Sequence, residues 1–424
     1  MSTVLRRPFS SFWAILEYLW NPLLGIVLTP VLLGTLGEEL FGYWTMLFAA
    51  ISLGAILNFG TGTAIVKRIA ETVPSDPSAR ARLISSAMAI ACIGATASSL
   101  TLGVCFQFGG ELIFPRMARL DLLVYVGWCA ALTCFVEQLD NVLASTLKGM
   151  ERFSLAANLE MASRTVQFAA VAATALHFKA LEPVCLAVFA TSLLRLAVKT
   201  AVVARLFGAS AVLPGWHIDR PMLKLAKWGW AQGAGGVFFG VADRLIVGAM
   251  LGPISLAQYA VAIQLAQQIH AIPAAGSSVL LPQLSRRGRT ETHADIARAV
   301  SKIYALMICA IVLTAVALAA FGRDILQWWL RLPVSAESVQ LFRYLTVAFA
   351  VLALNVVPYF VLLAIGRARL AAAATIGAGA ISCALMLWLT PLAGIDGVGY
   401  AKIAYGLVTT AILVPAFIGL RFAK

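Results

Sequence analysis

The amino-acid sequence predicts an all-α polytopic membrane protein, with about 12 transmembrane helices in two six-helix lobes related by a parallel pseudo-two-fold repeat. Hydrophobic residues make up 61% of the 424 residues and charged residues only 12%, whereas soluble proteins keep about a quarter of their residues charged. The apolar residues form blocks of the length that a helix needs to span ~30 Å of hydrocarbon. An internal repeat then divides these blocks into two sets.

Each block predicts one membrane-spanning helix, because a backbone in lipid must satisfy its N–H and C=O groups within its own segment. The first block continues past Leu33 without a small-residue cleavage site, so we interpret it as a retained helix and not as a secretory signal. In chain order, the spans are expected near residues 12–34, 39–63, 83–107, 120–145, 155–178, 183–206, 223–250, 254–281, 300–321, 340–365, 369–391 and 398–420.

Basic residues predict how these spans are oriented. If both termini and the even-numbered loops share one side, that side carries 21 basic residues and the other side carries 5. Cytoplasmic loops are enriched in Lys and Arg, so both termini are expected in the cytoplasm. This topology accounts for the net charge of +13 without a compact basic domain, and no nucleic-acid partner is expected.

Two short segments reveal the internal repeat. LGEELFGYW at Leu36–Trp44 and LGPISLAQY at Leu251–Tyr259 each join two spans, and each pair of spans ends in a basic dipeptide, Lys67-Arg68 or Arg286-Arg287. The offsets of 215 and 219 residues are close to half the chain. Parallel repeats of this kind place the substrate near the bilayer midplane between the two halves. The predicted organisation is an N-terminal six-helix lobe at 1–206, a cytoplasmic linker at 207–222 and a C-terminal six-helix lobe at 223–424.

Ionisable residues inside the spans mark functional candidates. Span one carries Glu17 and Asn21 on one face, before Pro22. In spans four to six, polar side chains share helix faces from mid-membrane towards the cytoplasm, at Glu137, Asp140, Asn141 and Lys148, at Glu160, Arg164 and Gln167, and at Arg195 and Lys199. Two interpretations remain open: a partly cationic vestibule for an anionic headgroup, or ion pairs that hold these helices together.

Spans seven and eight carry a second polar region. Span seven presents Gly229, Gly233, Gly236, Gly240, Asp243 and Arg244 on one face. Its glycines either pack closely against another helix or line a substrate path. Span eight carries Gln264, Gln267, Gln268 and His270 on one side, followed by Pro273. These glutamines either hydrogen-bond neighbouring helices or line a cavity, and His270 is either a packing residue or a proton site.

The sequence contains no Walker A motif, HExxH motif or nucleophile elbow. Its seven cysteines lie in apolar spans and form no CxxC pair, so no disulfide framework, metal site or cofactor is expected. A polytopic glycan ligase or polymerase would need a substantial outer loop bearing polar catalytic residues, and the predicted outer loops are short. We therefore expect a membrane transporter and not an enzyme.

Two segments carry a resemblance to a known family. DRLIVGAMLGPISLAQYAVAIQLAQQI, followed by PQLSRR, and LGTLGEELFGYWTMLFAAISLGAILNFGTGTAIVKRIAE resemble polysaccharide-repeat-unit flippases of the multidrug/oligosaccharidyl-lipid/polysaccharide exporter superfamily. The resemblance implies a two-lobed fold in the bacterial inner membrane. It implies translocation of undecaprenyl-diphosphate-linked oligosaccharide by alternating access, with coupling to H⁺ or Na⁺ in some branches. It also implies a role in O-antigen, lipopolysaccharide or exopolysaccharide biosynthesis, in association with polysaccharide polymerase machinery.

Under this resemblance, the polar residues divide into two expected sets. The cavity residues that bind substrate are Arg195, Lys199, Arg164, Arg244, Gln264, Gln268 and Asn21, and the coupling or gating residues are Asp243, Glu137, Asp140, Glu17 and His270. Some related flippases have arginines in the first helix, where this chain has Glu17. The alternative is a drug/cation antiporter of the same superfamily. That function would need a cavity of net negative charge, which the basic residues of spans five to seven disfavour.

Overall fold

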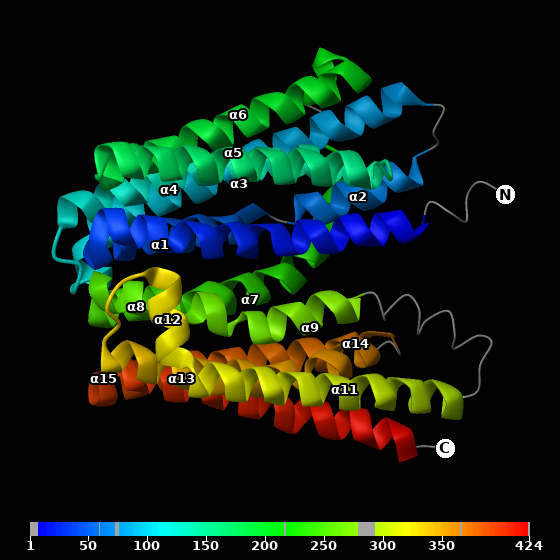
Figure 1. The fold of residues 1–424 in the computed structure, drawn as a ribbon. Coiled ribbons are helices and arrows are strands. Elements are labelled where there is room, and N and C mark those ends of the chain that lie inside the picture. The colour runs from blue at the N-terminus through cyan, green and yellow to red at the C-terminus, as the bar shows by residue number, and fades with distance from the viewer. Residues whose placement is uncertain are drawn as a thin grey trace. The chain divides into compact units, whose positions relative to one another are not determined.

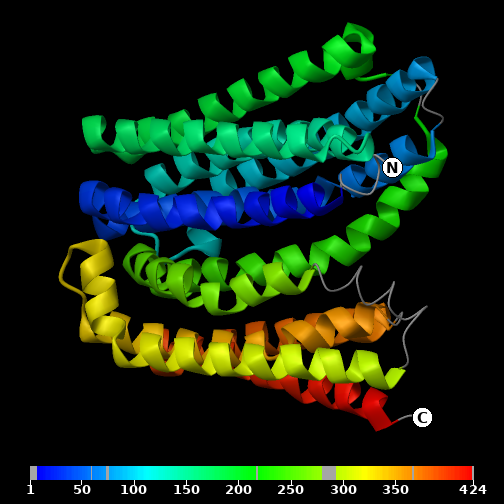
Figure 2. The same cartoon turned by 45° about the vertical axis from the view of Figure 1, so that its right-hand side comes forward.

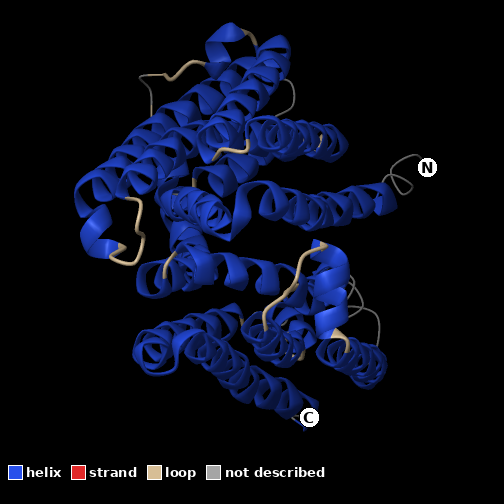
Figure 3. Ribbon diagram, turned by 60° about the vertical axis from the view of Figure 1, so that its left-hand side comes forward, coloured by secondary structure: helices blue, strands red, loops and turns tan. Residues whose placement is uncertain are grey.

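The structure, a computed structural model, describes residues 7–58, 60–72, 76–215, 218–278, 293–364 and 367–422. Over these ranges all regular structure is helical (Figure 3). The helices are α1 (Arg7–Gly54), η1 (Ala55–Asn58), α2 (Thr61–Glu71), α3 (Pro77–Ile113), α4 (Leu120–Gly149), α5 (Phe153–Phe178), α6 (Leu181–Phe207), η2 (Ala209–Val212), α7 (Arg220–Leu251), α8 (Pro253–Ala266), α9 (Gln268–Ser278), α11 (His293–Ala320), α12 (Gly322–Leu330), α13 (Ala336–Ala353), α14 (Val356–Ala364) and α15 (Ala368–Phe422). The two η elements are 3-10 helices.

Over the described residues, each of the twelve predicted spans falls on one or more of these helices. Among the described residues, seven helices are long and apolar enough to cross a membrane. Two of the helices, α1 and α15, each hold two predicted spans, because each contains one residue outside helical geometry, Gly37 (φ 79°, ψ 171°) and Gly394 (φ 58°, ψ −135°). The prediction of an all-α polytopic membrane protein is confirmed.

Large apolar side chains on the outer faces of the helices agree with a lipid environment. Phe108 and Leu112 of α3 are 82% and 86% exposed, and Leu306 and Leu313 of α11 are 74% and 73% exposed. Soluble proteins rarely expose continuous apolar patches, because water disfavours them. The exposed fractions therefore identify lipid-facing surfaces of a multi-pass membrane protein.

Three helices begin where their sequences provide a capping side chain. The side chains of Asp76, Asp219 and Ser335 accept hydrogen bonds from the backbone N–H groups at the starts of α3, α7 and α13. Proline follows directly in the first turn of α3 and α7, where its missing N–H costs no hydrogen bond. These caps set the ends of helices that their apolar residues alone would not define.

The chain divides into two compact units, Met1–Leu24 with Val31–Ile254 and Gly25–Pro30 with Ser255–Lys424. Helix α7 belongs to the first unit, where it packs against α2. The repeat in the sequence instead assigns this helix to a C-terminal lobe that begins at residue 223, and the lobe boundaries stay a prediction. Each unit is described by itself below.

In the first unit, α3 and α4 pack along their length (Figure 1). Small and large residues alternate across their contact. A Cβ on Gly103 would lie 2.6 Å from the Trp128 ring, and a Cβ on Gly127 would overlap Phe106, so each glycine accommodates an aromatic ring of the other helix. Close approach at small residues is the usual way in which membrane helices gain packing energy.

A salt bridge closes the end of the first unit that the basic residues predict to be cytoplasmic. Arg68 of α2 donates two hydrogen bonds to Asp219, from Nε to Oδ2 at 3.0 Å and from Nη2 to Oδ1 at 3.2 Å. Asp219 also caps α7 through Met222, and its backbone N–H donates to Ser86 of α3 at 2.8 Å. Asp219 therefore joins three helices, through its carboxylate to α2 and α7 and through its backbone N–H to α3.

In the second unit, α11, α13 and α15 lie side by side (Figure 2), and a break within span ten separates α13 from α14. Pro358 has no N–H to bond the carbonyl of Leu354, and the Tyr304 hydroxyl donates to this carbonyl at 3.0 Å. The amide of Asn355 donates to Thr410 of α15 at 2.9 Å. Neighbouring side chains thus satisfy the interrupted backbone, as lipid requires.

The break in α1 gives a test of the backbone. Replacement of Gly37 by Ala should destabilise the protein by ~1–3 kcal/mol, because its positive φ is strained for any residue with a Cβ, while nothing within 4 Å would clash with the methyl group. Gly34, one turn earlier, also has open space around it and no positive φ. Gly34→Ala should therefore stabilise the helix slightly. Thermal unfolding in detergent checks both variants, and equal effects would contradict the prediction.

A charge-balanced cavity in the first unit

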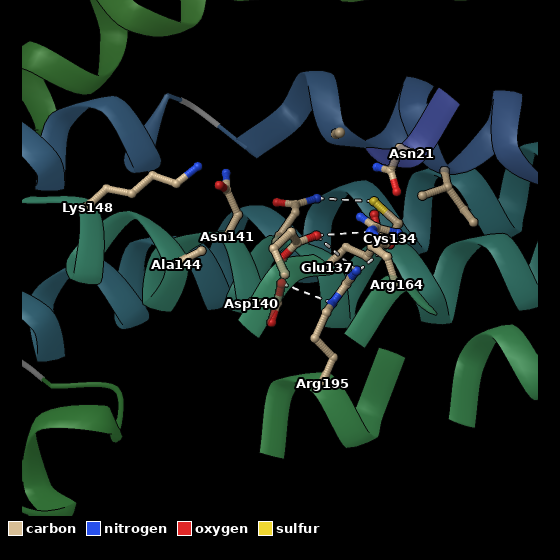
Figure 4. Close-up of a pocket in the computed structure, with 13 residues that line it drawn as sticks. Asn21, Cys134, Glu137, Asp140, Asn141, Ala144, Lys148, Arg164 and Arg195 are labelled. Carbon is tan, nitrogen blue, oxygen red and sulfur yellow. Dashed lines mark hydrogen bonds and ion pairs between the residues drawn. The ribbon is translucent and has the colours of Figure 1, made fainter. Parts of the chain in front are cut away.

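The first unit contains a cavity of about 640 Å³, within the range of ~300–1,000 Å³ that is common for ligand sites. Helices α1, α4, α5 and α6 and the short η1 contribute its walls (Figure 4). Trp20 holds α1 against α5 beside the cavity, since its indole N–H donates to Thr165 at 3.0 Å. The lining residues are Asn21, Ile51, Ala55, Cys134, Glu137, Gln138, Asp140, Asn141, Ala144, Lys148, Glu160, Arg164 and Arg195.

Three helices each contribute two charged residues to one ion-pair network. The residues are Glu137 and Asp140 of α4, Glu160 and Arg164 of α5, and Arg195 and Lys199 of α6. Each pair is three or four residues apart, so both side chains project from one face of their helix. The spacing on each helix therefore explains why six charges from three spans meet at one place.

Every cation of the network contacts at least two carboxylates. Lys199 Nζ lies 2.6 Å from Glu160 Oε2 and 2.7 Å from Asp140 Oδ2. Arg195 lies 3.0 Å from Glu137, 3.1 Å from Asp140 and 3.5 Å from Glu160. Arg164 lies 2.9 Å from Glu160 and 3.4 Å from Glu137. Three positive and three negative charges thus form a connected set with no net charge.

Burial makes this balance necessary. Lys199 is fully buried and Arg195 is 3% exposed, and a charge in a membrane interior is costly unless it is paired. The candidate cations of span six are therefore engaged with carboxylates in the structure, which favours the second interpretation of the sequence, ion pairs between helices. The network also borders the cavity, so its outer members, Glu137 and Arg164, remain within reach of a ligand.

Amide side chains extend the polar wall. Gln167 of α5 accepts from Arg164 at 3.1 Å and donates to Ser192 of α6 at 3.2 Å. Gln138 of α4 donates to Ser98 of α3 at 2.5 Å. Asn141 accepts from Ser145 at 3.5 Å. Gln167 ties Arg164 to α6, while Gln138 and Asn141 join the same wall to α3 and to the next turn of α4.

The remaining candidates in span one and span seven are placed as follows. Asn21 lines the cavity, whereas the side chain of Glu17 lies outside the described part of the structure. Asp243 is buried and accepts from the backbone N–H of Arg244 at 2.7 Å, and the Arg244 guanidinium donates to the carbonyl of Gly240 at 3.3 Å. Neither of these charged residues lines the cavity of the first unit.

The glycine face of span seven is described only at its end. A Cβ on Gly240 would meet nothing within 4 Å, so this position is not tightly packed in the structure. The surroundings of Gly229, Gly233 and Gly236 lie outside the described part of the structure. Their packing or lining role stays a prediction.

Span eight is interrupted at Gln267, between α8 and α9. The backbone N–H groups of His270 and Ala271 both bond the carbonyl of Gln267. Gln268 donates from its amide to the carbonyl of Gln264 at 3.0 Å. These residues belong to the second unit and are not part of the cavity of the first, so the sequence-predicted cavity set is not gathered at one place within either unit.

Two residues important to the cavity were absent from the expected site. Glu160 bonds two of the three cations at under 3 Å, and its position one turn before Arg164 is the sequence signal for this role. Gln138 is 3% exposed and lines the cavity. Its sequence signal is weak, because a single glutamine in an apolar span equally indicates a hydrogen bond to a neighbouring helix.

The network predicts a specific dependence on charge balance. Lys199→Met should destabilise the protein by about 3–5 kcal/mol, because two buried carboxylates lose a counter-charge. The double variant Lys199→Met/Glu160→Gln removes one positive and one negative charge, so two carboxylates and two arginines remain and the network is again neutral. It should therefore be more stable than the single variant. Thermal unfolding in detergent measures both.

The exposed pair Lys67–Glu71, with side chains 60% and 48% exposed, is the matched control. Lys67→Met should change stability little, since exposed ion pairs contribute about 0–1 kcal/mol. Additive losses from the Lys199 and Glu160 substitutions would show that the network does not act as a balanced set.

Comparisons with known proteins agree with this architecture. The family model described as "Polysaccharide biosynthesis protein" matches residues 10–287, more than half of the 424-residue chain. No curated protein sequence matches the chain.

Solved structures with the same fold cover nearly the whole chain. An inward-facing multidrug resistance MATE family transporter of the MOP superfamily is 14% identical, with a TM-score of 0.69 and 96% of each chain covered. The lipid II flippase MurJ in an inward closed conformation is 12% identical, with a TM-score of 0.76 and with 96% of this chain and 87% of that chain covered. A MOP superfamily transporter from Pyrococcus furiosus, described by a reversed polarity of its binding pocket, is 14% identical, with a TM-score of 0.55 and with 97% of this chain and 95% of that chain covered.

Because the sequences are only 12–14% identical, the solved structures establish the fold alone. The family model establishes the family to which the chain belongs. The helices predicted from the sequence, the repeat segments at its two halves and the match over residues 10–287 point the same way. The chain belongs to the polysaccharide biosynthesis protein family, and its fold is that of the MOP superfamily exporters.

Proposed function

We propose that this protein is a flippase that moves undecaprenyl-diphosphate-linked oligosaccharides from the cytoplasmic to the periplasmic leaflet of the bacterial inner membrane by alternating access. The products would serve cell-surface polysaccharides such as O-antigen, lipopolysaccharide or exopolysaccharide. The observation that carries the proposal is a polar cavity of about 640 Å³ inside a unit of membrane-spanning helices, in a chain of the polysaccharide biosynthesis protein family.

The physical need for such a cavity is clear from the substrate. A diphosphate with attached sugars cannot cross hydrocarbon unaided, because each unpaired polar or charged group is costly there. The cavity offers charged and amide side chains at the depth where lipid offers none. The polyprenyl chain needs no such site, because it is soluble in the bilayer.

We further propose that the diphosphate binds towards the end of the cavity marked by Lys148. This residue lines the cavity on α4, at the end of span four that the basic residues predict to be cytoplasmic. Arg195 and Lys199, the cations that the sequence analysis offered as phosphate ligands, already hold carboxylates. Their proposed role is therefore to shape the polar wall.

The charge of the cavity favours this function over drug or cation antiport. Its charged lining residues are Glu137, Asp140 and Glu160 against Lys148, Arg164 and Arg195, and Lys199 adds a further positive charge behind them. A site for organic cations would need a net negative charge. Proton or Na⁺ coupling through Asp243, Glu137, Asp140, Glu17 or His270 stays part of the proposal.

Vesicles test the proposed function directly. Purified protein is reconstituted with fluorescently labelled undecaprenyl-diphosphate-linked oligosaccharide, and a membrane-impermeant quencher is added outside. Vesicles without protein should lose only the signal of the outer leaflet, whereas vesicles with protein should lose the signal of both leaflets. If vesicles with protein lose only the signal of the outer leaflet, as vesicles without protein do, and if they export an organic cation such as ethidium, the result would support the antiporter instead.

Lys148 gives the residue-level prediction. Lys148→Ala should slow translocation about tenfold or more, since a hydrogen bond to a charged group contributes ~1.5–3 kcal/mol. Lys148→Arg, which keeps the positive charge, should retain most of the rate. The matched control is Lys67→Ala on α2, an exposed lysine that does not line the cavity. Equal rates for Lys148→Ala and Lys67→Ala would exclude Lys148 as a substrate contact.

A further inference from the structure

Two cysteines of the first unit meet where α4 packs against α6. Cys129 of α4 and Cys185 of α6 are both buried, at 7% and 0% exposed, and their thiols hydrogen-bond each other. Both are free thiols in the structure. They lie 56 positions apart in two different spans, so no sequence motif indicates the pair, and only the packing of the two helices brings them together.

A regular series of contacts fixes the register between α4 and α6. The Tyr125 hydroxyl donates to the carbonyl of Glu182 at 3.1 Å, across 57 positions of the chain. Arg195 donates to Glu137 at 3.0 Å, across 58 positions. The cysteine pair, at 56 positions, lies between these two contacts in both helices. The geometry of two parallel helices in register therefore places the thiols opposite each other, independently of their own hydrogen bond.

The pair also lies near one end of the unit. Cys185 follows Leu181, the first residue of α6, by four positions, which is ~6 Å along a helix that rises 1.5 Å per residue. The basic residues predict this end of span six to be periplasmic. The bacterial periplasm is kept oxidising, and disulfides form and persist there.

The other cysteines of α4 and of the exposed surface have different surroundings. Cys134, five positions after the pair on α4, accepts from the Gln138 amide at 3.3 Å and lies 4.0 Å from the Ser98 hydroxyl. Cys105 and Cys309 are exposed. Cys134 is thus a buried thiol on the same helix whose neighbours are an amide and a hydroxyl, and it is the matched control for the pair.

We propose that Cys129 and Cys185 are oxidised to a disulfide that joins α4 to α6 in the periplasmic half of the membrane. The oxidant is a disulfide-carrying thiol oxidoreductase of the periplasm. One cysteine thiolate attacks the disulfide of this oxidoreductase and forms a mixed disulfide. The second cysteine thiolate then attacks the mixed disulfide at the sulfur of the first. The two thiols lose two protons and two electrons, and the oxidoreductase leaves as a dithiol.

The covalent bond would hold the register on which the buried charges depend. Glu137 follows Cys129 by eight positions on α4, and Arg195 follows Cys185 by ten positions on α6. A disulfide stabilises a protein mainly by restricting its unfolded chain. Here it would also keep two parallel helices from sliding past each other, so that the carboxylates and cations of the network meet.

A count of free thiols tests the proposal in the full-length protein. Cells are quenched with acid and the protein is denatured, alkylated with N-ethylmaleimide and weighed by mass spectrometry, with and without prior reduction. The chain has seven cysteines, so five should react without reductant and seven after reduction. A digest of the unreduced protein should contain the peptide of Cys129 linked to the peptide of Cys185.

Single substitutions identify the partners. Cys129→Ala should leave six reactive thiols both with and without reductant, because Cys185 loses its partner. The control Cys134→Ala should leave four without reductant and six after reduction, since the pair is intact. Seven reactive thiols in unreduced wild-type protein would overturn the proposal and leave the two cysteines as small buried hydrophobic residues. A linked peptide that joins any other two cysteines would overturn it as well.

Thermal unfolding in detergent tests the structural role of the bond. Wild-type protein purified in reductant should unfold several degrees below the oxidised protein, whereas the double variant Cys129→Ala/Cys185→Ala should unfold at the same temperature with and without reductant. An equal effect of reductant on both proteins would overturn the role in holding the helices. The proposal depends on the orientation of the chain and not on its substrate, so its failure would leave the proposed function standing.

Discussion

The ion-pair network of α4, α5 and α6 is the interaction on which the first unit depends. Three apolar helices each carry two charges within or near their predicted spans, and no single helix could keep its charges in a bilayer alone. Their contacts at 2.6–3.5 Å make neutrality a property of the assembled unit. Once these three helices are fixed, the cavity beside them acquires a polar wall of defined composition, and α1 and η1 contribute the rest of its lining.

Neutrality also limits what the wall can bind. A cluster of unpaired arginines would hold a diphosphate strongly. A transport site that binds too strongly releases its substrate slowly, just as an ion channel conducts only if its sites let the ion leave. In this cavity each buried arginine already has its counter-charges, so the wall remains polar without acting as an anion trap. Recognition would then depend on hydrogen bonds to the amide and charged side chains that line the cavity. These bonds are individually modest and break one at a time.

The helices were predictable from the sequence because lipid permits few alternatives. Apolar blocks and loop charges predict the twelve segments, and helices cover them over the described residues. The partners within the network were less predictable. Helical spacing places Glu160 on the face of Arg164, but the sequence does not state which neighbouring helix that face meets. The joining of two spans into α1 depends on the backbone at Gly37 (φ 79°), and a glycine in a loop sequence predicts such a conformation only weakly.

The bonds of Gln138 show why a site can be harder to predict than the fold that holds it. The side-chain nitrogen of Gln138 bonds the carbonyl of Gly54 and the hydroxyl of Ser98. Those partners come from α1 and α3, which are 84 and 40 residues away along the chain. The local sequence therefore shows that a polar residue lies in a span, whereas tertiary contacts decide which of its side-chain atoms are bonded. In a membrane protein this difference is consequential, since lipid does not satisfy whatever polar atoms the helices leave unpaired.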